Sequence, residues 1–244
     1  MEEAAATGNE GVAHDEFVEK YGAMVLLDSL GTKGILATAT PASIINDWKA
    51  VVQLFDDAAA QAVTVEDCAG CEVATFSDTI MVTMHGPHLE PLIALMGSLI
   101  FEPLYAALLR GIYLRGAMSV GRFYQAATKI IGPAIDEAAE WDEQADWIGV
   151  AATPTLQRFL ELMRYQRWDV SRYFVAASIP WKSGTQPGWA LAWPTLALED
   201  EPHAKRDVLQ SFAHKGGRVG VAAASKYRNT LKFFDDVIAP QAQP

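Results

Sequence analysis

The spacing of apolar residues predicts a chain that mixes strands and helices. An apolar run over residues 21–28 predicts a buried strand that ends at Asp28. Residues 42–59 carry apolar positions at helical spacing and predict a helix. Strands near 62–67 and 72–84 are then expected to form a hairpin around the sequence CAGC.

The rest of the chain continues in the same alternating manner. The pattern predicts an apolar helix over 88–110 with a break near Pro103, a strand or strand pair over 112–126, a helix over 133–144, a short strand over 147–152, a helix capped by Thr153, a β pair around the loop 182–187, and a C-terminal helix within 221–239 that packs on the domain. The first six elements run β-α-β-β-α-β, the order of a ferredoxin-like or palm core. We therefore expect an α+β fold with a mostly antiparallel sheet flanked by helices, in which the first and third strands are neighbours.

Composition is typical of one acidic globular domain. The 244 residues are half hydrophobic and carry a formal net charge of −11. We expect a disordered tail over 1–18 and a single domain over 19–240. The acidic charge argues against a nucleic-acid polymer as partner, because such binding needs clustered Lys and Arg. No signal peptide is visible and the apolar helix carries Glu and Pro, so a cytoplasmic protein without a membrane span is expected.

Two cysteines, Cys68 and Cys71, form a single C-x-x-C. A structural zinc site would need a second pair of ligands. The intervening Ala-Gly suits a turn, which we favour over redox or metal chemistry.

Two aspartates stand where strand packing does not call for them. Asp28 closes the first strand, and a solvated strand end is the simpler interpretation of it. Asp78 lies within the apolar sequence TFSDTIMV, and a buried carboxylate has to be paired, hydrogen-bonded or metal-bound. Because the first and third strands are neighbours in this topology, the two carboxylates could share a divalent cation.

Four segments resemble, in order and spacing, the motifs of the class III nucleotide cyclases. They are LLDSLGTK, VATFSDTIMV, YLRGAMSVG and IIGPAIDEAAEWDE, and the resemblance covers about residues 20–195. It implies a two-metal reaction in which the ribose 3′-OH attacks the α-phosphorus of a nucleoside triphosphate and pyrophosphate leaves. It also implies a homodimer in which the metal aspartates of one chain face the IIGPAIDEAAE helix of the other.

The resemblance assigns roles to residues in these motifs. It implies that Asp28, Asp78 and the backbone carbonyl of Ser29 bind two Mg²⁺ or Mn²⁺ ions. Arg115 would contact the terminal phosphates, with a surface arginine as the alternative. The turn whose N–H groups would face the phosphates consists of Leu30, Gly31 and Thr32, and Gly31 could equally be an ordinary turn glycine.

The chain departs from the family pattern at positions that contact the substrate, including those that select the base of the nucleotide. Asp136 and Glu140 stand where the family helix has an Asn and a transition-state Arg. Ala74 and Lys129 occupy the purine-selecting positions, and Ser77 replaces a glycine of the second motif. A conventional adenylate or guanylate cyclase is therefore not expected. The chain is more similar to the bacterial pyrimidine cyclases of the Pycsar anti-phage defence system.

Further residues are candidates for contact with the substrate. Lys129 could donate to a pyrimidine carbonyl and would favour UTP, or it could be solvated. Trp48 could narrow the base pocket, although a Trp at this helical spacing is typical of a core. Asp136 could polarise the ribose or base, or merely be solvated. The remaining candidates are Lys182, Arg228 and Asn229.

The leading hypothesis is a uridylate cyclase that makes 3′,5′-cyclic UMP as a second messenger for a separate effector protein. A cytidylate cyclase, which would convert CTP to cyclic CMP, is the alternative. An inactive nucleotide-binding module of the same fold is a second class of function, because the family Asn and Arg are missing. A palm-type polymerase or nuclease is disfavoured by the acidic charge.

Overall fold

An eight-stranded sheet forms the centre of the computed structural model, which describes residues 16–30, 41–126, 129–166, 169, 172–214 and 221–239. The strands are β1 (Val18–Ser29), β2 (Gly70–Phe76), β3 (Thr79–His85), β4 (Leu114–Ala126), β5 (Lys129–Ile131), β6 (Gly149–Ala152), β7 (Phe174–Trp181) and β8 (Gly184–Leu191). The helices are α2 (Pro41–Ala62), α3 (Leu89–Leu109), α4 (Pro133–Asp142), α5 (Pro154–Tyr165), α6 (Trp193–Asp200), α7 (Ala204–His214) and α8 (Val221–Ile238). The strand order is β2-β3-β1-β4-β6-β8-β7, with β5 paired to β4.

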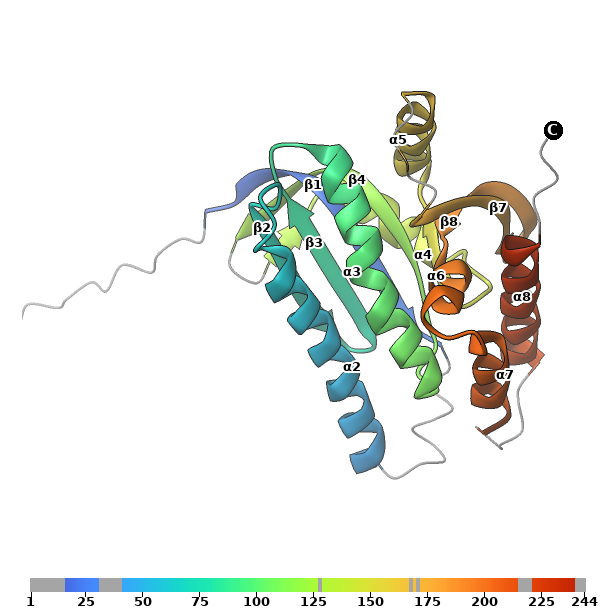
Figure 1. The fold of residues 1–244 in the computed structure, drawn as a ribbon. Helices are drawn as coiled ribbons and strands as arrows, with labels where there is room; N and C mark the ends of the chain where they lie inside the picture. Colours follow the sequence, from blue (N-terminus) through green and yellow to red (C-terminus); the bar gives the residue numbers. More distant parts are fainter. Residues whose placement is uncertain are drawn as a thin grey trace, which may run out of the picture.

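The first six elements confirm the predicted β-α-β-β-α-β core, as β1, α2, β2, β3, α3 and β4. Strand β1 lies between β3 and β4 and runs antiparallel to both, so the first and third strands are neighbours as expected. Figure 1 shows α2 and α3 side by side across one face of this sheet. The other face is covered by α4, which packs on β1 and β4.

Alternation along β1 distributes its side chains between these two faces. Leu27 is fully buried in the main core, which also includes apolar residues of α2 and α3. Met24 points the other way and packs against Ala134 and Ala138 of α4. Because side chains alternate along a strand, Asp28 belongs to the same face as Met24. The α4 face of the sheet therefore carries the candidate carboxylate.

The predicted hairpin was misplaced. Helix α2 continues to Ala62, and residues 63–69 form no strand, so the first hairpin strand expected near 62–67 is wrong. The Ala-rich end of α2 favours helix over strand. The hairpin turn is Ser77–Asp78, which joins β2 and β3, and polar residues of this kind favour turns.

The two cysteines consequently do not flank a turn. Cys68 is buried just before β2, Cys71 is half-buried within it, and both are free thiols. Burial raises the pKa of both thiols, that of Cys71 to about 12. Redox exchange requires thiolates, so these raised pKa values argue against a redox role for the pair.

The long apolar helix is continuous. Pro103 lies inside α3 and is buried, so the break expected there does not occur. Residues along the length of α3 contribute to the core, and this packing offsets the backbone hydrogen bond that a proline removes. Among the described residues, α3 is the one helix long and apolar enough to cross a membrane, and 61% of that stretch is buried within the fold.

The sheet extends beyond the ferredoxin-like core. Strand β6 adds to β4 in parallel, and the hairpin β7–β8 adds through β8. Helix α8 packs on β7, and the ring of Phe233 lies 4.1 Å from that of Trp147, centroid to centroid. The predicted β pair and C-terminal helix are confirmed, whereas α6 and α7 were not predicted.

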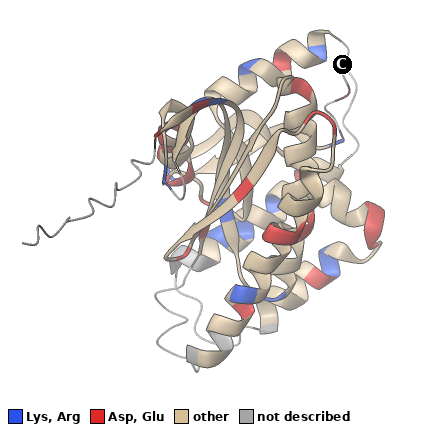
Figure 2. Ribbon diagram, turned by 90° about the vertical axis from the view of Figure 1, so that its left-hand side faces the viewer, with Lys and Arg blue, Asp and Glu red and all other residues tan. Residues whose placement is uncertain are grey.

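Acidic and basic positions are intermingled over the described part of the chain. Figure 2 shows Lys and Arg spread over several elements among Asp and Glu, without one basic stripe in the described residues.

Candidate active site

Asp28 and Arg115 form the central ion pair of the candidate site. They lie directly opposite one another in the β1–β4 ladder, and Nη2 of Arg115 lies 3.1 Å from Oδ2 of Asp28. Their side chains are 12% exposed for Arg115 and 25% for Asp28. Arg115 also donates from Nη1 to the carbonyl of Ala145 at 2.8 Å. Asp28 is thus a paired carboxylate, and Arg115 is not the surface arginine of the alternative interpretation.

The second aspartate is held against the end of β1. Asp78 accepts a backbone hydrogen bond on its carbonyl from the N–H of Ser29 at 3.0 Å. The preceding residue, Ser77, has φ +56°, in the left-handed region that favours glycine. Ser77 thus adopts a backbone conformation in which glycine, the residue that the resemblance expects here, would be unstrained. Asp28 and Asp78 lie at one end of two neighbouring strands, as predicted.

The segment after β1 is only partly described. Ser29 is buried, and the N–H of Leu30 donates to the carbonyl of Tyr113 at 2.7 Å. That N–H is therefore occupied within the fold and does not face a phosphate, contrary to expectation. Gly31 and Thr32 lie outside the described residues.

A third carboxylate, Asp142, adjoins the ion pair and was missed in the sequence. It is 8% exposed at the end of α4, and its Oδ1 has no hydrogen-bond partner. Burial raises the pKa of this carboxyl to about 7, with Arg115 opposing the rise and Asp28 adding to it. Arg115 is therefore flanked by two carboxylates, and its own Nε lacks a partner. The motif EWDE contains this residue, but its burial could not be inferred from helical periodicity.

The loop after α4 ties Arg115 to the C-terminal half of the chain. Asp146 accepts from Lys226 Nζ at 2.9 Å and from Asn229 Nδ2 at 3.1 Å, while the carbonyl of Asp146 accepts from the same Asn229 amide at 2.9 Å. Asn229 therefore anchors this loop rather than lying free to contact substrate. Arg228 is exposed on α8.

Glu137 joins three elements and was also missed. Its carboxylate accepts from Ser119 Oγ at 2.6 Å, from Thr153 Oγ1 at 3.1 Å and from the N–H of Thr155 at 3.0 Å. Thr153 is at the N-cap position of α5 but makes no side-chain capping bond, so that prediction is corrected: Glu137 of α4 satisfies an N–H of the first turn of α5. The network fixes α4 against β4 and α5.

Other predicted contact residues are spread over the surface and the core. Trp48 is half-buried on α2 and packs against the main core, as the alternative interpretation held. Three further candidates are exposed: Asp136 on α4, Lys129 on β5 and Lys182 in the β7–β8 turn. Their predicted contacts with substrate remain predictions.

The donor set at the ends of β1 and β3 fits a magnesium-type ion that is shared with a substrate. Asp28 and Asp78 are hard oxygen donors on adjacent segments, with the Ser29 carbonyl beside them in the chain. Within the described residues no group of three His, Cys, Asp or Glu side chains could hold a metal by itself. Mg²⁺ is usually held by one or two carboxylates with substrate phosphates completing its shell, so two aspartates are sufficient.

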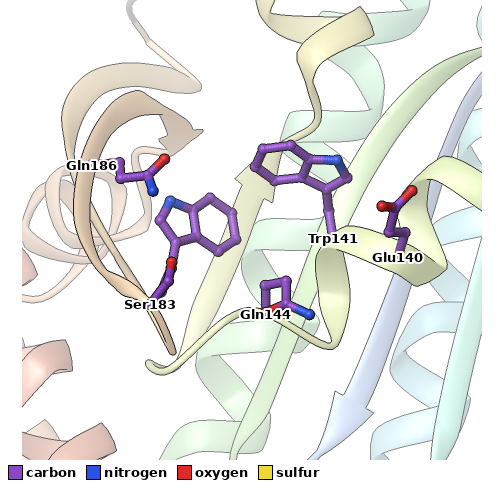
Figure 3. Close-up of a pocket in the computed structure, with 6 residues that line it drawn as sticks. Glu140, Trp141, Gln144, Ser183 and Gln186 are labelled. Carbon is purple, nitrogen blue, oxygen red and sulfur yellow. The ribbon is translucent and has the colours of Figure 1, made fainter.

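A pocket adjoins this region between α4 and the β7–β8 hairpin. It encloses about 190 Å³ and is lined by Glu140, Trp141, Gln144, Trp181, Ser183 and Gln186. Figure 3 shows Trp141 and Gln144 on one side, and Ser183 and Gln186 on the other. The Trp141 and Trp181 rings meet edge to face, 5.1 Å between centroids. The hairpin is held here by a hydrogen bond from the N–H of Lys182 to the carbonyl of Gln144 at 2.8 Å.

No protein-family model matches the chain, and no curated protein matches it in sequence. Solved structures do match in fold. The guanylyl cyclase domain of the RhoGC fusion protein from the aquatic fungus Blastocladiella emersonii, described as a non-canonical dimer, gives a TM-score of 0.53 at 12% identity over 73% of this chain and 98% of that one.

Two further cyclase structures give comparable values. The catalytic core of a rhodopsin-guanylyl cyclase with converted specificity, in complex with ATPαS, gives a TM-score of 0.51 at 11% identity over 72% of this chain and 98% of that one. An adenylate/guanylate cyclase/hydrolase from Silicibacter pomeroyi gives 0.50 at 17% identity, with the same coverage. The chain therefore has the fold of adenylyl and guanylyl cyclase domains.

Proposed function

We propose that this protein is a nucleotide cyclase that converts UTP to 3′,5′-cyclic UMP and pyrophosphate. The observation that carries the proposal is the junction of β1 with the β2–β3 turn. The Ser29–Asp78 backbone hydrogen bond of 3.0 Å and the β1–β3 ladder bring Asp28 and Asp78 to the same end of the sheet. The cyclase-domain fold of the chain supports a nucleotide cyclase and says nothing about the base.

In the proposed reaction the ribose 3′-oxygen attacks the α-phosphorus, the bond to pyrophosphate breaks, and the 3′-OH proton passes to solvent. Asp28, Asp78 and the Ser29 carbonyl would hold two Mg²⁺ or Mn²⁺ ions, which would neutralise charge on the attacking oxygen and the triphosphate. Arg115 would bind phosphate oxygens in a bidentate manner, in exchange for part of its contact with Asp28 and Ala145. The site's own ion pair thus holds the guanidinium in place before substrate binds.

The choice of a pyrimidine rests on the two positions that select purines in the class III cyclases. Ala74, on β2, offers no hydrogen bond to a base, and through the ladders with β3 and β1 it shares the sheet face of Asp28. Lys129 is exposed and can donate only, which suits the uracil O4 acceptor better than the cytosine amino group. CTP, giving cyclic CMP, is the alternative substrate.

We further propose a head-to-tail homodimer in which Asp28 and Asp78 of one chain face α4 of the other. In this arrangement Asp136 and Glu140, both exposed on α4, would border the partner's nucleotide. The cyclic nucleotide would act in the cytoplasm as a second messenger of anti-phage defence, read by a separate effector protein.

The decisive experiment incubates the purified full chain with ATP, GTP, CTP and UTP separately, in the presence of Mn²⁺ or Mg²⁺. We expect cyclic UMP and equimolar pyrophosphate, both abolished by EDTA. Asp78→Ala should lose turnover but keep its circular dichroism spectrum. Glu66→Ala should retain turnover, because Glu66 is an exposed acid just before β2, toward the end of the β2–β3 hairpin opposite to Asp78. Cyclic AMP or cyclic GMP as the main product would refute the pyrimidine assignment, and an active Asp78→Ala variant would refute the metal site.

One observation favours a second function, an inactive cyclase-fold module that binds a nucleotide and signals by contact. Asp136 and Glu140 are exposed acids where the resemblance expects an Asn and a transition-state Arg. Two added negative charges would repel the phosphates unless a cation intervenes. Saturable UTP binding by calorimetry without pyrophosphate release would establish this second function instead.

A further inference from the structure

An exposed phenylalanine stands beside the candidate metal ligands. Phe76 is 85% exposed at the end of β2, one residue before the Ser77–Asp78 turn. In the ladders it pairs with Thr79, which in turn pairs with Asp28, so all three side chains lie in one row on the α4 face. A single exposed apolar residue is ordinary. The position of Phe76, at a strand end next to the site, makes it a candidate anchor for a partner.

The pocket between α4 and the β7–β8 hairpin has the size and lining for an aromatic ring. Its volume is about 190 Å³, and a cavity of about 150 Å³ is large enough to bind benzene. Trp141 and Trp181 supply the apolar wall, and aromatic rings favour edge-to-face contacts with such indoles. Gln144 and Gln186 give the pocket a polar rim, as is usual around buried interface anchors.

Phe76 cannot reach the pocket of its own chain. It lies on β2, at one edge of the sheet, whereas Trp181 lies on β7, at the opposite edge. Trp181 pairs with Ala145, whose carbonyl Arg115 of β4 binds, and β4 is three strands from β2. Three strand spacings amount to roughly 14 Å, more than a phenylalanine side chain can span. An aromatic occupant from this protein must therefore come from a second copy.

We propose that Phe76 of one chain inserts into the Trp141–Trp181 pocket of a second copy. The inference rests on the head-to-tail pairing proposed above and names the contact that fixes it. That pairing sets the turn after Phe76 against the partner's α4, and the pocket begins on α4 at Glu140. Twofold symmetry repeats the contact, so each dimer contains two Phe76 anchors. Each anchor holds one chain's Asp78 in register with the other chain's α4.

The test is the dimer dissociation constant of the full chain, measured by sedimentation equilibrium without nucleotide. Phe76→Ala should raise this constant at least tenfold, because two well-packed aromatic anchors are lost per dimer. Tyr165→Ala is the matched control: Tyr165 is 86% exposed on α5, away from the proposed contact, and its loss should leave the constant unchanged. Both residues are exposed, so neither substitution should impair folding.

A second variant approaches the contact from the pocket side. Ser183→Trp, in the exposed β7–β8 turn, should fill the pocket and weaken the dimer as Phe76→Ala does. Dimerisation of Phe76→Ala as tight as that of Tyr165→Ala would overturn the inference, as would a parent protein that stays monomeric at every concentration. Because the readout is self-association, it is independent of catalysis. A tight, Phe76-dependent dimer that makes no cyclic nucleotide would retain this contact and refute the proposed function.

Discussion

Asp28 and Arg115 face one another across β1 and β4, with 3.1 Å between Oδ2 and Nη2, and this pair organises the end of the sheet. Through Nη1, Arg115 also donates to the carbonyl of Ala145. Ala145 belongs to the loop after α4, which is hydrogen-bonded to the β7–β8 hairpin. A residue of the candidate site is thus also a structural link between the ferredoxin-like core and the C-terminal extension. Its removal should affect the fold as well as any chemistry.

Arg115→Ala should lower the free energy of unfolding by about 2–4 kcal/mol, because it leaves two carboxylates without their cation and one carbonyl without its donor. Arg115→Lys should recover part of the loss, since an ammonium group keeps the charge but cannot serve both acceptors in the same geometry. Urea unfolding at pH 7.5 measures both. Arg206→Ala is the control, because Arg206 is 60% exposed in its pair with Asp207 and should change stability by less than about 0.5 kcal/mol. Equal effects at the two arginines would contradict the structural role of the pair.

Ser77→Gly should stabilise the protein by about 0.5 kcal/mol, although glycine usually destabilises. The reason is the φ of +56° at Ser77, which costs a residue with a Cβ about 1–2 kcal/mol. Thr75→Gly, in the exposed end of the same strand, provides the opposite case and should lose about 0.5–1 kcal/mol. Thermal unfolding of the two variants beside the parent gives the signs directly. A destabilised Ser77→Gly variant would show that the Ser77 side chain contributes more than its backbone strain costs.

The sequence was sufficient for the parts of the site that depend on strand order. The β-α-β-β-α-β pattern was readable from periodicity, and with it the neighbourhood of Asp28 and Asp78. The hairpin boundary was misjudged because an Ala-rich helix end and a polar turn both interrupt apolar alternation. The roles of Asp142 and Glu137 could not be predicted, because their partners lie at least 16 residues away in the sequence. Helical spacing also does not reveal which carboxylate is buried. Periodicity predicts faces, whereas burial and pairing depend on tertiary contacts.

Glu137→Ala should lower the free energy of unfolding by about 2–3 kcal/mol, since it leaves two hydroxyls and one N–H of the α4–β4–α5 junction without their acceptor. Hydrogen exchange adds a local readout: the Thr155 amide should exchange faster in this variant. Glu140→Ala, at an exposed position of the same helix, should change neither quantity appreciably. Unchanged protection of Thr155 in Glu137→Ala would contradict the cross-helix cap.

Asp142 predicts a specific dependence of stability on pH. Burial raises the pKa of its carboxyl to about 7 in the folded protein, whereas in the unfolded chain it titrates near its ordinary value of about 4. The folded state therefore binds this proton more tightly, and the stabilisation, fully present below about pH 4, is lost as pH rises through about 7.

Asp142→Asn resembles the protonated residue at every pH. The unfolding free energies of variant and parent should therefore be similar near pH 4, and the variant should become the more stable protein as pH rises. By pH 8 the difference should reach at most about 4 kcal/mol, a figure that already includes the opposing attraction of Arg115 because the raised pKa does. Urea unfolding of both proteins between pH 4 and pH 8 measures this curve. A flat difference for Asp142→Asn would mean that Arg115 keeps Asp142 ionised, and that the cation at this site is balanced by two carboxylates rather than one.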